Sequence, residues 1–323
     1  MSSMWLRIPT AQLDDRIREL ERAAYEHFGL AIREETLAIH TRIGDIDVRV
    51  LHTGSEDSQA PPILMLHGVG SFSVLAVEVM SYLADRRIVV LDWPGHGLSG
   101  PCAVPGPHAL RGLAVSVIEG VLDDLGIPVV DVVAHSLGGQ FSVYAALDLP
   151  RRIRRIVFLG CPGGAFAGAK PILPMMLLGV PQVGRRLLSS QVTPERFARF
   201  NDIANGPNAG AHLPEAVLEA CYYLTCRPSY GPSVATYFQA LVQGTRLRPA
   251  MVVPPEDLER IAQPVLMAWG DLDAFMPPGV AADSIVALRD HRLVRLRGAG
   301  HAPWLDEPEL VGAAVASHLA GSA

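Results

Sequence analysis

The stretch Asp131–Gln140, DVVAHSLGGQ, decides how this chain is interpreted. It places the hydroxyl group of Ser136 between an apolar run and two glycines. A sharp strand-to-helix turn that presents a nucleophile needs small residues two positions before and two positions after it, and Ala134 and Gly138 stand there. A tight turn without any chemistry would also need small residues. Other parts of the sequence separate the two interpretations.

The composition is that of a large globular protein. With 323 residues, 49% of them hydrophobic, the chain can bury a sizeable core, and at ~150 residues per domain it is long enough for two units. Its net charge of -6 favours neither nucleic acid nor an anionic membrane as a partner. No run reaches the ~18 apolar residues of a membrane span. Charged residues occur near the N-terminus before any apolar stretch long enough for a signal-peptide core. We therefore expect a cytoplasmic protein whose partner is a small-molecule substrate; the sequence leaves its oligomeric state open.

Short apolar runs alternate with helix-length segments along most of the chain. An amphipathic pattern over residues 11–28 predicts a helix, and residues 36–54 read as a hairpin. Continuous Val/Ile/Leu runs separated by helices indicate parallel strands that are buried on both faces. Between residues 162 and 262 no strand-like run appears, so we expect a helical insertion there. The predicted organisation is an N-terminal arm with the first strand (1–44), the first part of an α/β core (45–161), a helical cap (162–262) and the second part of the core (263–323).

Several motifs resemble those of other kinds of site, but each lacks a feature that such a site requires. Gly95–Gly100 matches G-x-G-x-x-G, but prolines at 101, 105 and 107 prevent the helix that a dinucleotide site needs. Gly163 and Gly168 have the outer spacing of a phosphate-binding loop, but Lys170 is displaced from the required place. No aromatic residues lie between the arginines at 151–155, so this cluster does not indicate a nucleic-acid-binding site. The four cysteines fit neither a disulfide framework nor a zinc site, so we expect reduced thiols.

Serine is a weak nucleophile, so it needs a base and a carboxylate that orients the base. The expected chain order for a strand-to-helix nucleophile is serine, acid, histidine. Two downstream loops, WGDLD ending at Asp273 and GAGHAPW around His301, each follow a strand-like run and should lie at the same sheet edge as Ser136. The amide groups of Val69, in a glycine-rich loop after another strand, and of Leu137 are candidates for an oxyanion hole.

Together these motifs resemble the α/β-hydrolase superfamily, in the group with a helical cap after strand six. The resemblance implies a mostly parallel eight-stranded sheet with helices on both faces and an inserted helical cap. It also implies that Asp273, rather than Asp271, is the acid that acts with Ser136 and His301, and it covers the chain from about residue 45 to the end. Ala134 departs from the glycine that the family usually has. The matching residues are His67–Val69, DWPGHGLS at Asp92–Ser99, AHSLGG at Ala134–Gly139, WGDLD at Trp269–Asp273 and GAGHAPWLDEP at Gly298–Pro308.

A serine triad suits acyl transfer, so the expected reaction is hydrolysis of a carboxylic ester, lactone or thioester, with no metal and no cofactor. Similar serine members cleave carbon–carbon bonds or act as cofactor-free perhydrolases, and both stay open. An alternative of another class is a ligand-binding receptor on a hydrolase fold.

Several further residues have expected roles beside the predicted triad. Asp92 and His96 are expected to fix a loop, and His135 to point away from Ser136. Packing of the cap against the core is the alternative role for the methionines at 175 and 176. The candidates for substrate contact are apolar residues of the cap or of the loops beside the triad: Met175, Met176, Phe275, Met276 and Trp304.

Overall fold

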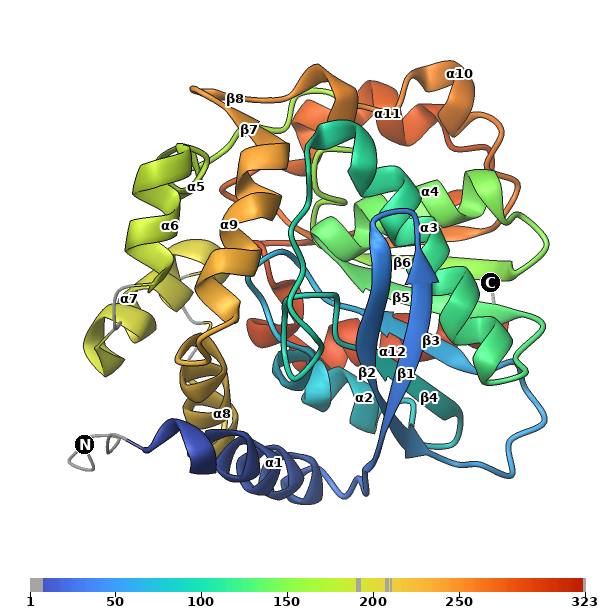
Figure 1. The fold of residues 1–323 in the computed structure, drawn as a ribbon. Coiled ribbons are helices and arrows are strands. Elements are labelled where there is room, and N and C mark those ends of the chain that lie inside the picture. The colour runs from blue at the N-terminus through green and yellow to red at the C-terminus, as the bar shows by residue number, and fades with distance from the viewer. Residues whose placement is uncertain (1–7, 190–192, 207–208, 210, 322–323) are drawn as a thin grey trace.

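The computed structural model describes residues 8–189, 193–206, 209 and 211–321. One eight-stranded sheet forms the centre of the molecule, in the order β1-β2-β4-β3-β5-β6-β9-β10 (Figure 1). β2 runs antiparallel to both of its neighbours, and every other neighbouring pair is parallel. This confirms the mostly parallel sheet and the N-terminal hairpin predicted from the sequence. The strands are β1 (Arg33–Thr41), β2 (Gly44–Gly54), β3 (Ile63–Leu66), β4 (Arg87–Leu91), β5 (Val130–His135), β6 (Ile153–Leu159), β9 (Val265–Gly270) and β10 (His291–Leu296).

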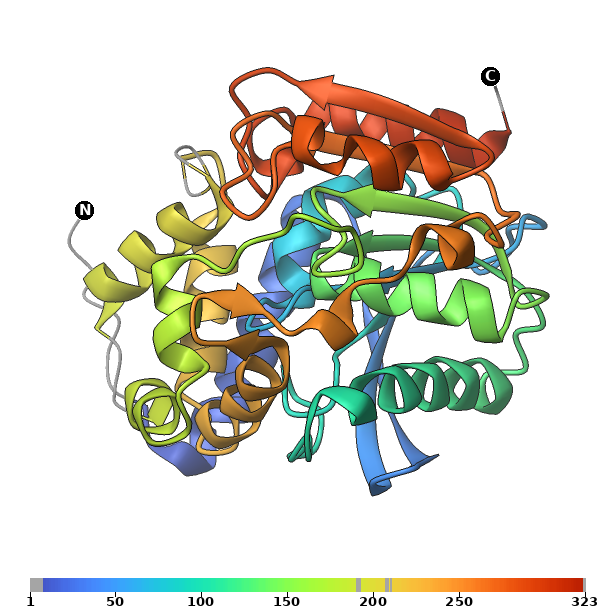
Figure 2. The same cartoon turned by 90° about the horizontal axis from the view of Figure 1, so that it is seen from above.

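Helices cover both faces of the sheet (Figure 2). α3 packs beside α4, and α12 packs beside α2. The helices of this part of the chain are α2 (Val77–Ser81), α3 (Pro107–Asp124), α4 (Leu137–Asp148), α11 (Ala282–Ala287) and α12 (Pro308–Ala320), with short 3₁₀ turns at Ser73–Ala76, Pro278–Ala281 and Pro303–Leu305.

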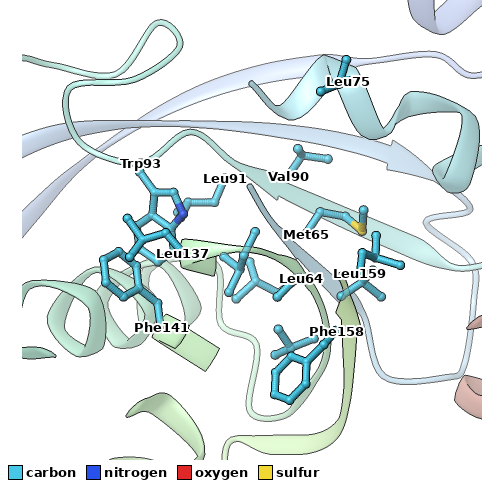
Figure 3. Packing of buried hydrophobic residues seen from close by; sticks show 14 of the residues in the cluster. Leu64, Met65, Leu75, Val90, Leu91, Trp93, Leu137, Phe141, Phe158 and Leu159 are labelled. Atoms are coloured by element: carbon cyan, nitrogen blue, oxygen red, sulfur yellow. The ribbon is translucent and has the colours of Figure 1, made fainter. Parts of the chain in front are cut away.

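The central strands are buried on both faces, which explains their continuous apolar runs. Every residue of β3, β5 and β9 is buried. Figure 3 shows side chains of β3, β4 and β6 packed with those of the helices and loops around them, and Trp93 meets Phe141 edge to face at 4.7 Å. Burial of one such large side chain stabilises the fold by roughly 1.5–3 kcal/mol. This core holds the strand ends, and therefore the loops that follow them, in fixed positions.

Between β6 and β9 the chain leaves the sheet, and we refer to residues 162–262 as the cap segment. Its helices are α5 (Leu173–Leu178), α6 (Pro181–Ser189), α7 (Pro194–Asn205), α8 (Glu215–Thr225), α9 (Tyr230–Leu241) and α10 (Pro255–Leu258), with a 3₁₀ turn at Pro249–Met251. These helices gather to one side of the sheet except α10, which lies beside α11 (Figure 1). The expectation that this segment holds no strand is wrong in one place, where β7 (Val242–Gln243) pairs with β8 (Arg246–Leu247). Two residues per strand are too few to leave a periodic pattern in the sequence.

The N-terminal helix α1 (Thr10–His27) lies against α8 of the cap segment (Figure 1). Its apolar face buries Leu13 and Ile17. Two ion pairs fasten it to the cap segment, one between Arg227 and Asp14 at 2.9 Å and one between Arg16 and Glu219 at 3.2 Å. The predicted helix of the N-terminal arm is thus present, and it is packed on the body with the cap segment as its helical neighbour.

A buried ion-pair network joins α1 to the sheet. The Arg49 guanidinium, on β2, pairs with Glu21 of α1 at 2.5 Å and with Asp92, which follows β4, at 3.1 Å. Asp92 also accepts hydrogen bonds from the Ser73 hydroxyl and, at 3.1 Å, from the Leu98 amide. Burial alone would raise the pKa of Asp92, but the charges of Arg49 and His67 and the hydrogen bonds from Ser73 and Leu98 together outweigh burial and lower that pKa. The network therefore fixes the loops after β3 and β4, as expected for Asp92.

Two further expectations concern the chain as a whole. None of the helices in the described residues combines the length and the apolar character that crossing a bilayer requires. All four cysteines are free, as predicted, and Cys102, Cys161 and Cys221 are buried.

Candidate active site

Ser136 occupies a strained turn between β5 and α4. Its backbone has φ 52° and ψ -117°, and it is the one non-glycine residue with positive φ in the described part of the chain. Such a conformation costs of order 1–3 kcal/mol and persists only where the surroundings hold it. The turn is so tight that a Cβ atom at Gly138 would lie 2.4 Å from the carbonyl oxygen of Leu66. The small residue predicted at this position is thus a steric requirement.

His301 and Asp273 meet across two loops at the same edge of the sheet. The Nδ1 atom of His301 lies 2.9 Å from Oδ2 of Asp273, and the two residues are 4% and 1% exposed. Asp273 follows β9 and His301 follows β10, so the parallel strands bring both to the edge where β5 delivers Ser136. Asp271, the other candidate acid, instead accepts a hydrogen bond from the amide of Gly298 at 2.7 Å.

Asp273 is surrounded by hydrogen-bond donors. Its Oδ2 also accepts from the Trp269 indole at 3.1 Å and from the Cys161 amide at 3.2 Å. Its Oδ1 accepts from the amide of Phe275 at 2.9 Å. Burial would raise the pKa of this carboxyl, but the neighbouring His301 and these hydrogen bonds outweigh burial and lower it. Asp273 is therefore an ionised acceptor, and His301 donates its Nδ1 proton to it.

A cavity of about 1110 Å³, including space open to solvent, lies beside these residues. Ser136 and His301 both line it, and its wall continues into the cap segment. Of the expected substrate contacts, Met175 and Phe275 line it. Most of the wall is apolar: Val69, Phe72, Leu75, Leu137, Ile172, Met175, Leu178, Leu188, Phe197, Phe200, Phe238, Leu241, Leu247 and Phe275.

Val69 and Leu137, the candidate oxyanion-hole residues, lie at this cavity. Leu137 is the first residue of α4, so its amide has no acceptor within the helix. The Val69 loop is held by His96, whose Nε2 accepts a hydrogen bond from the Gly70 amide at 3.0 Å. Burial, followed by the nearby His67, lowers the pKa of His96 to about 3, so it stays a neutral acceptor. This is the loop-fixing role predicted for His96.

His135 packs against the proposed base. Its ring centroid lies 4.7 Å from that of His301 and 4.8 Å from that of Trp304. Burial, and then the charge that His301 can carry, hold the pKa of His135 well below its usual range. The sequence predicted only that His135 points away from Ser136. The structure adds that this neutral ring packs against the His301 ring and also lines the cavity.

Three of the expected substrate contacts do not line this cavity. Trp304 is buried behind His135, where its indole donates to the carbonyl of Leu75 at 3.0 Å and its ring borders a separate, smaller cavity. Met276 is completely buried, and its carbonyl accepts from the Trp269 indole at 3.0 Å. Met176 is half-buried in α5 and turned away from the wall. Nearness in sequence to a catalytic loop did not determine where these side chains point.

The sequence did not single out three polar residues of the cavity wall. Gln140, on α4, donates to the carbonyl of Met251 at 2.9 Å and accepts from the amide of Gly164 at 3.0 Å, so it ties the sheet to the cap segment. Asn201 and Asn205, one turn apart on α7, are buried at the wall. An Asn pair at i, i+4 on an amphipathic helix was the one available signal.

One group of potential metal ligands occurs in the described residues. Suitable atoms of Cys161, Asp273 and His301 all lie within 4.8 Å of one another. Both oxygens of Asp273 already accept hydrogen bonds from N–H donors, and Nδ1 of His301 is one of those donors. The group does not fit a resident metal, because its lone pairs are already engaged. That the reaction needs no metal remains a prediction.

Known proteins resemble this chain over most of its length. It is 27% identical over 274 residues to the magnesium-chelatase 30 kDa subunit of Rhodobacter capsulatus, covering 82% of this chain and 88% of that protein. It is 26% identical over 273 residues to 2-hydroxy-6-oxononadienedioate/2-hydroxy-6-oxononatrienedioate hydrolase 2 of Pseudomonas putida, covering 81% and 89%. Among solved structures, the carboxylesterase CesB from Bacillus subtilis superposes with a TM-score of 0.70 at 19% identity, covering 97% of this chain and 100% of that one. At that identity the likeness shows the fold alone.

A family model provides the assignment. The model described as the alpha/beta hydrolase family matches residues 63–314, more than half of the chain. The match includes the strained Ser136 and the paired Asp273 and His301. The chain belongs to the alpha/beta hydrolase family.

Proposed function

We propose that this chain is a serine hydrolase that cleaves a carboxylic ester, lactone or thioester through an acyl-enzyme, with an apolar acyl or alcohol group in the cavity. The observation that carries the proposal is the meeting of three features at one wall: Ser136 in its strained turn, His301, and the ionised Asp273 bonded to His301. Ser136 is half-buried, and backbone strain at a single residue of this kind is typical of functional sites.

Each group has a role in the proposed reaction. Because Asp273 holds the Nδ1 proton of His301, Nε2 is left as the acceptor for the Ser136 proton. As Oγ of Ser136 forms its bond to the carbonyl carbon, the electron pair of the C=O bond moves onto oxygen, and His301 becomes an imidazolium. Asp273 stabilises that cation, and the Val69 and Leu137 amides would stabilise the oxyanion.

Collapse of this intermediate breaks the bond to the alcohol or thiol, which takes the proton from Nε2 of His301. The acyl group is then an ester of Ser136. A water molecule, which gives a proton to His301, then attacks the acyl carbon in the same way. This second step releases the carboxylic acid and free Ser136. One ester and one water thus yield one acid and one alcohol, and no other reactant is required.

Cleavage of a carbon–carbon bond by the same triad is the second candidate, favoured by the name of the Pseudomonas putida relative. That name denotes a dicarboxylate substrate. Lys170 is the one cationic side chain in the described part of the wall, and it is exposed. Burying a carboxylate against an apolar wall is costly without a paired charge. We therefore rank an uncharged ester first.

The experiment is active-site labelling. A fluorophosphonate should modify the protein once, at Ser136, as read by peptide mass spectrometry. Ser136→Ala should abolish labelling and reduce hydrolysis of a nitrophenyl ester by ~10⁴–10⁶. Ser71→Ala removes another hydroxyl from the same cavity and is the matched control, expected to stay within a fewfold of the parent.

Labelling at a different residue, or Ser136→Ala activity within tenfold of the parent, would contradict the proposal. A protein that neither labels nor hydrolyses any ester would instead be the non-catalytic receptor. Release of a dienoate product, with no activity toward esters, would favour the carbon–carbon hydrolase.

A further inference from the structure

Two asparagines interrupt the apolar wall of the cavity. Asn201 and Asn205 lie one turn apart near the end of α7 and are only 8% and 9% exposed. The Nδ2 atom of Asn205 donates to Oδ1 of Asn201 at 2.7 Å. Both side chains line the same cavity as Ser136 and His301. Buried amides in an apolar wall are unfavourable unless their hydrogen-bonding groups find partners.

Gln140 and Tyr230 are two other buried polar side chains of this wall, and both are engaged within the protein. Gln140 is bonded to Met251 and Gly164, and the Tyr230 hydroxyl donates to the carbonyl of Gly70 at 2.9 Å. By contrast, the amide nitrogen of Asn201 and the amide oxygen of Asn205 have no hydrogen-bond partner among the residues that the structure describes. This pair therefore keeps bonding capacity that faces the cavity.

The pair is held beside the proposed catalytic histidine. The backbone carbonyl of Asn205 accepts a hydrogen bond at 2.9 Å from the amide of Ala302, the residue after His301. Gly206 and Gly300 approach so closely that a Cβ atom on Gly300 would lie 2.5 Å from Cα of Gly206. The end of α7 and the His301 loop therefore form one unit, and a group bound by the asparagines has a defined position relative to the triad.

The chemistry of the pair selects a type of ligand. Whichever way the two amides are oriented, one N–H group bonds to one C=O group, which leaves one amide NH₂ and one amide oxygen of the pair without a partner in it. These two groups match a ligand group that both accepts and donates a hydrogen bond. A carboxylate only accepts, so it would meet the amide oxygen with no partner.

We propose that the Asn201–Asn205 pair binds a neutral hydroxyl or carboxamide group on the substrate. The physiological substrate would then be an apolar ester that carries one such group at a distance from the bond to be cleaved. This inference rests on the proposed function, because it names the substrate class of the same site.

The experiment compares three series of nitrophenyl esters that share the same chain lengths and end in a methyl, a hydroxyl or a carboxylate group. The parent should show its highest kcat/KM on a hydroxyl ester of one particular length. Asn201→Leu should lower kcat/KM on that ester about tenfold, mainly through KM, and change the methyl ester less than twofold. Asp202→Leu is the matched control, because it removes an exposed polar side chain from the adjacent position of α7, and it should change neither ester.

Equal losses on the hydroxyl and methyl esters would show that the pair serves only the structure, and no loss on either would show that it binds nothing; both overturn the inference. So would a parent that prefers the carboxylate series. If Asn201→Leu does not fold, Asn201→Asp keeps the acceptor for Asn205 and removes the NH₂ donor, and the same selective loss is expected. Hydrolysis of the methyl ester by the parent tests the proposed function separately, so the two failures are distinguishable.

Discussion

At the scale of single residues, Asp273 shows how one carboxylate organises several loops. It accepts hydrogen bonds from His301, Trp269, Cys161 and Phe275, which come from different segments of the chain. An asparagine there would place an NH₂ group among N–H donors and could no longer stabilise an imidazolium. We predict that Asp273→Asn lowers kcat/KM about 10³–10⁴-fold, measured with a nitrophenyl ester.

Asp271→Asn is the control for this prediction. Among the described residues, the side chain of Asp271 is bonded only to the Gly298 amide, through Oδ1, and an asparagine keeps an oxygen that can accept there. Its activity should stay within a fewfold of the parent. The reverse ranking of the two variants, with both folded by circular dichroism, would refute the assignment of Asp273.

At the scale of elements, the contact between α7 and the loop after β10 links the cap segment to His301. A Cβ atom on Gly300 would lie 2.6 Å from the carbonyl oxygen of Asn205, as well as against Gly206. Backbone atoms cannot yield as the end of a side chain can, so the helix and the loop must separate. We predict that Gly300→Ala lowers ester hydrolysis 10–100-fold, because small displacements of catalytic groups are costly, and destabilises the fold by about 1–3 kcal/mol.

Gly279→Ala provides the comparison, because no atom lies within 4 Å of a Cβ atom built there. It should leave both activity and the free energy of unfolding near those of the parent. A Gly300→Ala protein with parental kinetics would mean that the position of α7 does not influence His301.

At the scale of the whole molecule, Arg49 joins the N-terminal helix, the sheet and the loops beneath the site. It is 1% exposed and pairs with two buried carboxylates, Glu21 and Asp92. Removal of the guanidinium leaves both carboxylates buried without a counter-charge. We predict that Arg49→Met lowers the free energy of unfolding by about 3–5 kcal/mol, measured by denaturant titration.

The exposed pair between Arg260 and Asp257 is the reference for that effect. Its arginine side chain is 62% exposed, so Arg260→Met should cost less than about 1 kcal/mol. Similar losses for the two variants would mean that the buried network contributes no more than a surface pair.

The strands and the positions of the proposed triad were predictable from the sequence. Continuous apolar runs marked the buried strands because such runs report burial on both faces. Ser136 and Asp273 each follow such a run, His301 follows the strand-like run HRLVRL of the edge strand β10, and parallel strands place their following loops at one edge. The short β7–β8 pair was missed because two-residue strands have no period.

Which wall each side chain faces was decided only by the tertiary structure. Trp304 and Met276 stand next to the catalytic loops in sequence, yet neither lines the cavity: the Trp304 indole bonds to the Leu75 carbonyl, and Met276 is completely buried. Asn201, about a hundred residues before His301, reaches the cavity because the end of α7 rests on the His301 loop. Strands and sharp turns depend on residues that are neighbours in the chain, so the local sequence determines them. The direction of a side chain in a loop or a cap helix depends on contacts between distant segments, which exist only once the chain has folded.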